Sequence, residues 1–312
     1  MKDLLRTADL SRADVELLLN TAADFAANPL RSNTALASKS VAIYMTKPST
    51  RTRLASETAV AHLGGTPIFI RGDELQLGRG ETIADTARII SGYCDALIIR
   101  TFAQSDVDEL GANATVPVIN GLTDDDHPTQ LLADWVTIRE NFGADISGRK
   151  FVYLGDGNNM AHAWLTMGAI MGAHVVAATP TGAWAPDAEV ISQAKAIAAT
   201  TGATIEVTSD PEAAAKDASV LYTDVWMSMG DPEAERIEKT KALSPFKVSQ
   251  KLMDLTDKDS IFMHCLPAHR EEEVATSVID GPKSVIWRQA YHRRTTIQAL
   301  LYHLTRSELQ GR

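Results

Sequence analysis

Residues 47–53, Lys-Pro-Ser-Thr-Arg-Thr-Arg, bring cationic and hydroxyl side chains together where a short β-branched run gives way to helical spacing. The first turn of a helix has backbone N–H groups without intrahelical acceptors, and these groups attract anions together with the helix dipole. Arginine adds bidentate hydrogen bonds that match phosphate oxygens. The segment therefore indicates a phosphate site. It also fits a surface helix capped by Ser49 or Thr50, in which Arg53 pairs with an acidic side chain one turn later.

His127 opens a long stretch of helical spacing and is followed by Pro128, Thr129 and Gln130. A histidine at this place could donate a hydrogen bond to a carbonyl oxygen that gains negative charge during a reaction, an effect often worth about 3 kcal/mol. Proline is also common in the first turn of an ordinary helix. The residues around His127 leave both interpretations open.

Asp224 and Cys265 each lie near the end of an apolar run in the second half of the chain. The carboxylate of Asp224 suits a cationic amine. The Leu-Pro that follows Cys265 ends the strand there, which places the thiol at the carboxyl edge of a parallel sheet. A lone cysteine is most often a small buried side chain. Another run ends in Gly-Asp-Gly at residues 155–157, which could begin a dinucleotide fingerprint, but Met160 stands at the position of the third glycine.

Taken in order, these segments resemble the aspartate and ornithine carbamoyltransferase family. The matching motifs are Ser-Thr-Arg-Thr-Arg at 49–53, His-Pro-Thr-Gln at 127–130, Gly-Asp-Gly-Asn-Asn-Met-Ala-His at 155–162, Asp-Val-Trp-Met-Ser-Met-Gly at 224–230 and His-Cys-Leu-Pro at 264–267. The resemblance extends from the N-terminal helix to about Trp287. The last two motifs are similar to the ornithine branch of the family. The resemblance implies transfer of the carbamoyl group of carbamoyl phosphate to the side-chain amine of L-ornithine, which gives citrulline and phosphate.

The resemblance also assigns residues to each substrate. Carbamoyl phosphate would be bound by Ser49, Thr50, Arg51, Thr52, Arg100, His127, Gln130, Cys265, Leu266 and Arg293. L-Ornithine would be bound by Asn159, Asp224, Ser228 and Met229. Met229 would act through its backbone, because a thioether is a weak acceptor. No metal and no other cofactor is expected.

The implied reaction is a direct attack by the neutral side-chain amine on the carbonyl carbon, followed by loss of phosphate. Four of the assigned residues would be catalytic: Cys265, Arg100, His127 and Asp224. Arg100 and His127 would hold the oxyanion. An alkyl ammonium with a pKa of about 10.4 must lose a proton before it attacks, so Asp224 and the Cys265 thiolate would steer or accept that proton. Orientation of the two substrates would supply much of the rate.

The C-terminal motif departs from the family pattern. That pattern usually reads as an acidic pair, Ala, Glu, Asn and Arg, whereas residues 287–294 read Trp-Arg-Gln-Ala-Tyr-His-Arg-Arg. Arg293 is retained and is expected to contact the carbamoyl group, but the usual orienting groups are missing. Two alternatives therefore remain, a carbamoyltransferase for another amine acceptor such as putrescine and a non-catalytic descendant that binds these ligands. An NAD-linked enzyme is a third alternative, which Met160 disfavours.

Composition limits the partners and the setting of the chain. The 312 residues carry a formal net charge of -10, which argues against sequence-independent nucleic-acid binding. The two cysteines, Cys94 and Cys265, lie far apart in sequence and suggest neither a disulfide framework nor a structural zinc site. Charged residues interrupt every hydrophobic run, and the N-terminus lacks the pattern of a signal peptide. We expect a cytoplasmic protein that binds no membrane.

The segment 72–81, which includes Gln76, Leu77 and Gly78, bears on assembly. In the family this loop reaches the active site of a neighbouring subunit. The resemblance therefore implies a homotrimer or a multiple of trimers.

Two series of alternating strands and helices would position these residues. The first has strands at residues 41–45, 67–70, 96–100 and 117–120 and ends where a long helix begins at His127. The second has strands at residues 150–156, 174–180, 204–209, 219–226 and 260–267. Such alternation is typical of parallel sheets covered by helices. We therefore predict an α/β fold with two doubly wound parallel-sheet domains joined by the long helix.

The last apolar stretch, residues 293–307, has the spacing of an amphipathic helix, which we place back on the first domain. The predicted carbamoyl phosphate-binding domain comprises residues 1–142 and is completed by residues 290–312. The predicted ornithine-binding domain comprises residues 143–289. Because ligands bind beyond the carboxyl ends of parallel strands, the loops that carry the motifs are expected to face one cleft.

Overall fold

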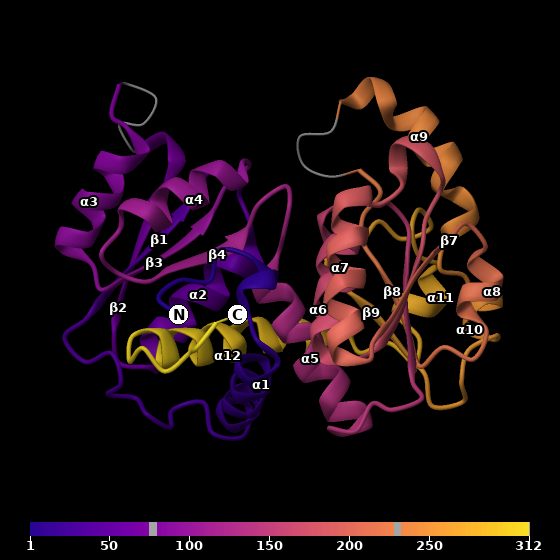
Figure 1. Ribbon diagram of the computed structural model, residues 1–312, viewed down its shortest axis with the longest axis horizontal. Coiled ribbons are helices and arrows are strands. Elements are labelled where there is room, and N and C mark those ends of the chain that lie inside the picture. The colour runs from indigo at the N-terminus through magenta and orange to yellow at the C-terminus, as the bar shows by residue number, and fades with distance from the viewer. Residues whose placement is uncertain (75–79, 228–231, 312) are drawn as a thin grey trace. The chain divides into compact units, whose positions relative to one another are not determined.

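The computed structural model describes residues 1–74, 80–227 and 232–311. The chain divides into two compact units, one formed by Met1–Val136 with Tyr291–Arg312 and the other by Thr137–Ala290 (Figure 1). Each unit has a parallel sheet flanked by helices, so the predicted fold class is confirmed. The long helix α5 (Pro128–Phe142) and the C-terminal helix α12 (Ile286–Leu304) each contribute residues to both units.

The sheet of the first unit has four parallel strands in the order β2-β1-β3-β4. Their bounds are β1 (Ser40–Met45), β2 (Thr66–Arg71), β3 (Ala96–Arg100) and β4 (Val118–Leu122). The intervening helices are α2 (Thr50–His62), α3 (Ile83–Tyr93) and α4 (Gln104–Asn113). From β1 the chain passes to β2 on one side and then returns to β3 on the other side. Ligands bind at such a reversal of strand order, just beyond the carboxyl ends of β1 and β3.

Burial explains why the central strands of this sheet were readable from sequence. All five residues of β3 and nearly all of β1 are buried, because helices cover both faces of a parallel sheet. The edge strand β2 has no fully buried residue. One core cluster of this unit contains Leu97, Ile99 and Val118 from the strands, and Ile90 and Val107 from α3 and α4.

The sheet of the second unit has five parallel strands in the order β7-β6-β5-β8-β9. Their bounds are β5 (Lys150–Leu154), β6 (His174–Ala178), β7 (Thr204–Thr208), β8 (Val220–Thr223) and β9 (Ile261–His264). The helices are α6 (Asn159–Met171), α7 (Ala188–Thr201), α8 (Pro211–Ala215), α9 (Arg236–Leu243), α10 (Gln250–Met253) and α11 (Thr276–Ile279). The strand order reverses between β5 and β8, which makes their carboxyl ends the expected ligand site of this unit.

All five strands predicted for the second unit are shorter than the sequence suggested, and three of them end before residues assigned to the site. The runs at 150–156, 219–226 and 260–267 end as strands at Leu154, Thr223 and His264. The polar residues that follow, among them Asp224 and Cys265, lie in the loops just beyond the sheet. These loops are where side chains are able to reach a ligand.

Terminal helices complete the first unit. α1 (Arg12–Ala27) packs near α12, where the rings of Phe25 and Tyr302 meet edge to face with 5.9 Å between their centroids. The predicted return of the C-terminal helix to this unit is confirmed, but α12 begins at Ile286, well before the predicted start at residue 293. Its first turns bury polar Gln289 and His292, so they lack the apolar spacing that marks the rest of the helix.

Several short helices were not predicted. α4 has a polar sequence with few buried apolar residues, chiefly Val107 and Leu110, and α8, α10 and α11 have only four or five residues each. Periodicity is not legible over such lengths. Across the part of the chain that is described, no helix combines the length and apolarity needed to cross a membrane.

Candidate active site

Ser49 ends the loop after β1 and caps helix α2. Its backbone is extended, and its Oγ accepts a hydrogen bond from the backbone N–H of Thr52 at 3.2 Å. Arg53 Nε donates to Glu57 at 3.1 Å one turn further on. The capped-helix interpretation of residues 47–53 is therefore correct as local structure. It does not compete with anion binding, because Arg51, in the same first turn, is not part of the cap, and its charge is near enough to His127 to lower the pKa of that imidazole.

The hydroxyl of Thr52 joins two arginines that are far apart in the sequence. Arg100 Nη1 donates to Thr52 Oγ1 at 3.5 Å, and Arg293 Nη2 donates to the same oxygen at 3.3 Å. All three side chains are buried, with at most 7% of either arginine exposed. The end of β3 and the interior of α12 thereby bring two guanidinium groups to the first turn of α2.

Gln130 holds the second arginine from the first turn of α5. Its Oε1 accepts a hydrogen bond from Arg293 Nη1 at 2.6 Å, and its Nε2 donates to Asp134 Oδ1 at 2.8 Å. These two contacts fix which end of the amide is oxygen. The Gln130 side chain therefore orients Arg293.

His127 is neutral in this environment. Burial lowers the pKa of His127 well below its usual value, and the positive charges of Arg293, Arg100 and Arg51 lower it further. A neutral imidazole can still donate one N–H. The three arginines that help to keep His127 uncharged would also attract an anion with several oxygens, such as a phosphate. Unit one thus gathers, at one sheet edge, eight of the residues assigned to carbamoyl phosphate: Ser49, Thr50, Arg51, Thr52, Arg100, His127, Gln130 and Arg293.

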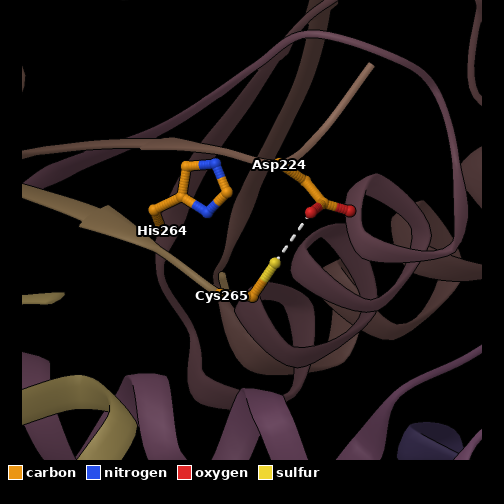
Figure 2. A group of neighbouring side chains, drawn as sticks. All are labelled: Asp224, His264 and Cys265. Carbon is orange, nitrogen blue, oxygen red and sulfur yellow. Dashed lines mark hydrogen bonds between the residues drawn. The ribbon is translucent and has the colours of Figure 1, made fainter. Parts of the chain in front are cut away.

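In the second unit, Asp224 and Cys265 meet at the ends of β8 and β9. Cys265 Sγ donates to Asp224 Oδ1 at 2.8 Å, as the dashed line in Figure 2 marks. The same oxygen accepts the backbone N–H of Val225 at 2.8 Å. Asp224 is only 8% exposed. A buried carboxylate beside a thiol provides a negative site for a cationic amine.

The loop that carries Cys265 is held by His264. His264 Nδ1 accepts the backbone N–H of Leu266 at 2.8 Å, so its Nε2 carries the proton that is shared with Glu273 Oε1 at 3.1 Å. Leu266 has a positive φ of 59° and precedes Pro267 through a cis peptide bond. Gln289 Oε1 accepts the backbone N–H of His264 at 2.9 Å.

Asp224, His264 and Cys265 are also the kinds of residue that bind metal ions, and their ligand atoms lie within 4.8 Å of one another. Both ring nitrogens of His264 are already engaged, with Leu266 and with Glu273. The lone pair of Nδ1 accepts from Leu266, and Nε2 carries the proton shared with Glu273, so neither nitrogen has a lone pair left for a metal ion in this arrangement. The three side chains do not form a ready-made metal site.

The glycines at 155 and 157 have packing roles. Gly155 has a φ of +136°, and a Cβ at Gly157 would lie 2.2 Å from the carbonyl carbon of Ala185. Two loops can approach here only because residue 157 lacks a side chain. This packing accounts for the Gly-Asp-Gly sequence that could be mistaken for a nucleotide motif.

Of the other residues assigned to ornithine, only Asn159 is among the residues that the structure describes. Asn159 is the first residue of α6, beside the carboxyl end of β5. Ser228 and Met229 lie outside the described residues, as do Gln76, Leu77 and Gly78. Leu266 and Cys265, which were assigned to carbamoyl phosphate, belong to the second unit with Asp224.

Sequence reasoning missed three residues that support the site. Asn158 precedes helix α6 and contacts Asp224, while Glu273 and Gln289 hold His264. Asparagine before a helix is a recognisable cap signal. For Glu273 and Gln289 the sequence gives no such signal, because their partners are distant in the chain.

The departure in the C-terminal motif leaves Arg293 well held. Gln130 and Thr52 provide the contacts that the absent Glu and Asn were expected to make. Arg288 forms a bidentate ion pair with Glu140 at 2.5 and 2.8 Å. The altered residues thus have structural partners of their own.

Comparison with known proteins covers nearly the whole chain. Residues 2–140 match the family model described as aspartate/ornithine carbamoyltransferase, carbamoyl-P binding domain. Residues 147–304 match the model described as aspartate/ornithine carbamoyltransferase, Asp/Orn binding domain. The chain is 48% identical to the ornithine carbamoyltransferase of Anoxybacillus flavithermus over 97% of this chain and 96% of that protein. It is also 48% identical to the anabolic ornithine carbamoyltransferase of Pyrococcus furiosus, over 96% and 95% of the two chains.

Solved structures give the same result. The ornithine carbamoyltransferase of Pyrococcus furiosus superposes with a TM-score of 0.93 at 47% identity and covers 99% of this chain and 98% of its own. The anabolic ornithine carbamoyltransferase of Campylobacter jejuni superposes with a TM-score of 0.93 at 36% identity, over 98% of this chain and 100% of its own. The resemblance inferred from the motifs is confirmed, and the chain belongs to the aspartate/ornithine carbamoyltransferase family.

Proposed function

We propose that the protein is an ornithine carbamoyltransferase, which converts carbamoyl phosphate and L-ornithine to L-citrulline and phosphate. Family membership and the names of relatives at 48% identity support this function. The observation that carries the first half of the reaction is the contact of Thr52 Oγ1 with both Arg100 and Arg293 beside a neutral His127. Fixed guanidinium groups of this kind suit a phosphate and the oxyanion of a carbonyl.

We assign the substrates to the two units as follows. Residues 1–142 with 290–312 form the carbamoyl phosphate-binding domain, and residues 143–289 form the ornithine-binding domain. The family models that match these parts of the chain support the division. Ornithine would be bound by Asn159, Asp224, Ser228 and Met229, and carbamoyl phosphate by the cluster in unit one with Cys265 and Leu266.

The reaction follows from the charges of these groups. The ammonium of ornithine is attracted by Asp224 and loses a proton to the pair formed by Asp224 and Cys265. The neutral nitrogen then forms a bond to the carbonyl carbon, and Arg100 and His127 hold the resulting oxyanion. Collapse breaks the bond between that carbon and the bridging oxygen, so phosphate leaves with the bonding electrons. The departing phosphate takes the second proton that the attacking nitrogen gives up.

The decisive assay supplies the purified protein with carbamoyl phosphate and, separately, ornithine, putrescine or lysine, and measures both phosphate release and the ureido product. Citrulline formed from ornithine alone would establish the proposal. A product from another amine would retain the chemistry and overturn the acceptor. Ligand binding without any product would favour the non-catalytic alternative.

Two variants test the anion site within the same helix. Arg51→Ala should abolish binding of carbamoyl phosphate, because it removes a charge that lies near His127. Arg53→Ala is the matched control, since Arg53 is exposed and pairs with Glu57. Unchanged affinity in Arg51→Ala would contradict the assignment.

We also propose a homotrimer or a multiple of trimers, in the cytoplasm. The family resemblance supports the assembly, and the absence of a disulfide at Cys94 and Cys265 is compatible with a reducing compartment. Light scattering of the purified protein should give a multiple of three chain masses. A monomer would contradict the assembly.

A further inference from the structure

Asn158 connects helix α6 to Asp224. It is the N-cap residue of α6, and its Oδ1 accepts the backbone N–H groups of Met160 at 2.9 Å and Ala161 at 3.3 Å. Its Nδ2 donates to Asp224 Oδ2 at 3.3 Å. One side chain therefore caps a helix with its oxygen and holds a carboxylate with its nitrogen.

Tyr153 fixes the direction of this amide from strand β5. Its hydroxyl donates to Asn158 Oδ1 at 3.1 Å, and the ring is fully buried. Burial raises the pKa of Tyr153 well above its usual value, and the nearby carboxylates of Asp224 and Asp156 raise it further. The hydroxyl therefore stays protonated and remains a donor.

Three donors thus converge on one atom of the Asn158 amide, so that atom is the oxygen. The nitrogen of the amide is left facing Asp224, and a flipped amide would set an N–H₂ group against three donors. With Oδ1 of Asp224 taken by Val225 and Cys265, both oxygens of the carboxylate are held.

We propose that Asn158 and Tyr153 are positioning residues for Asp224, and that they fix the orientation of its carboxylate toward the amine of ornithine. The inference rests on the proposed function, because Asp224 is there the residue that receives the amine. Neither Asn158 nor Tyr153 needs to touch a substrate. Their effect is on the angle of the Asp224 carboxylate and on the stabilisation of its negative charge.

The expected consequence of losing the Asn158 amide follows from its hydrogen bond. An N–H donated to a carboxylate stabilises its negative charge, so removing the Asn158 amide leaves the Asp224 carboxylate less well stabilised and less well held. Oδ2 of Asp224 also loses the donor that holds it, so the carboxylate is free to rotate. Both changes weaken the attraction of the ornithine ammonium to this site.

Asn158→Ser separates the two roles of the side chain. Serine caps helices about as well as asparagine, so the helix start is preserved while the amide nitrogen is lost. Tyr153→Phe leaves the Asn158 amide in place but removes the donor that orients it. Asp210→Ser, at the N-cap of α8, is the matched control for a cap exchange, since Asp210 follows β7, the edge strand that β6 and β5 separate from β8 and Asp224.

For Asn158→Ser we expect kcat/KM for ornithine to fall by about tenfold or more, the usual scale for losing a hydrogen bond to a charged group. KM for ornithine should rise, while KM for carbamoyl phosphate stays unchanged. Tyr153→Phe should change both properties in the same direction by a smaller factor. Asp210→Ser should leave both at the wild-type values.

Alkylation of Cys265 by iodoacetamide, followed on its own peptide, gives a readout that needs no turnover. Asn158→Ser leaves the negative charge of Asp224 less neutralised beside the thiol, so the pH midpoint of alkylation should rise. Wild-type kinetics and a wild-type alkylation midpoint in Asn158→Ser would overturn the inference. If the alkylation midpoint rises in Asn158→Ser but the wild-type protein makes no citrulline, the positioning role is upheld and the proposed function is overturned instead.

Discussion

Arg293 Nη1 donates to Gln130 Oε1 at 2.6 Å, although the two residues stand 163 positions apart in the chain. Gln130 lies in the first turn of α5 and Arg293 lies within α12. The contact is buried, so the guanidinium is held without the flanking residues that usually precede this arginine in the family. The altered C-terminal motif therefore does not by itself imply a lost site.

Replacing Arg293 with lysine tests this arrangement. Lysine has a single ammonium and cannot make separate contacts with Gln130 and Thr52. We expect KM for carbamoyl phosphate to rise by about tenfold or more, because hydrogen bonds to charged groups contribute about 1.5–3 kcal/mol. Steady-state kinetics would measure it. Arg294→Lys is the control, since Arg294 contacts His62 and Gln298 instead. Equal kinetics in the two variants would contradict the role of Arg293.

Thr52→Val should damage the same cluster from its centre. The substitution keeps the shape of the side chain but removes the oxygen that accepts from Arg100 and Arg293. Leaving buried donors without this acceptor costs about 1–3 kcal/mol. We expect a lower thermal midpoint and weaker binding of carbamoyl phosphate, measured by calorimetry. Thr52→Ser restores the hydroxyl and should recover most of the thermal midpoint and of the affinity for carbamoyl phosphate. If the serine variant is as impaired as the valine variant, the loss comes from changed packing and not from the missing hydroxyl.

Sequence reasoning reached the fold because the strands are buried on both faces. Residues 96–100 were read correctly as a strand, since all five are buried and apolar up to Arg100. The first turns of α12 were missed because they bury Gln289 and His292, which carry no apolar periodicity. The spacing of apolar residues in a sequence indicates which apolar side chains are buried. It gives no sign of polar side chains that are buried because they form hydrogen bonds with residues distant in the chain.

The candidate site divides in the same way. Family motifs pointed to Arg100, His127 and Asp224, and the structure puts each at the carboxyl edge of a sheet. Residues that act through another side chain were not found. Glu273, for example, lies nine positions after its partner His264, a separation that no helical or strand period would associate.

The neutral state of His127 gives a pH-dependent stability. Its pKa is lowered well below the usual 6.5, so below about pH 6.5 the unfolded chain binds a proton that the folded chain does not. This contribution to stability is present above pH 6.5 and is lost as the pH falls. Each pH unit below 6.5 removes up to about 1.4 kcal/mol from the free energy of unfolding.

Asp126 acts in the opposite direction, because burial raises the pKa of its carboxyl from 3.8 to about 6. In the wild type the two contributions offset each other below pH 6.

His127→Gln removes the first contribution and leaves the second. The variant should therefore gain stability relative to the wild type as the pH is lowered from 6.5 toward 4.5. Urea unfolding at a series of pH values measures this difference. A difference between the two proteins that does not change with pH would show that His127 is not held neutral.

Two neighbours in the altered C-terminal motif should differ in their effect on stability. Gln289 is 1% exposed and accepts the backbone N–H of His264, so Gln289→Ala leaves a buried donor without that acceptor and should cost about 1–3 kcal/mol. Arg288 and Glu140 form an ion pair that is open to solvent, so Arg288→Ala should cost less than about 1 kcal/mol. Thermal unfolding of the two variants gives the comparison.

Because His264 holds the loop of Cys265, Gln289→Ala should also lower citrulline formation, whereas Arg288→Ala should not. Similar losses in both variants would mean that the exposed ion pair contributes as much as the buried hydrogen bond, and that position 289 has no particular connection to the thiol.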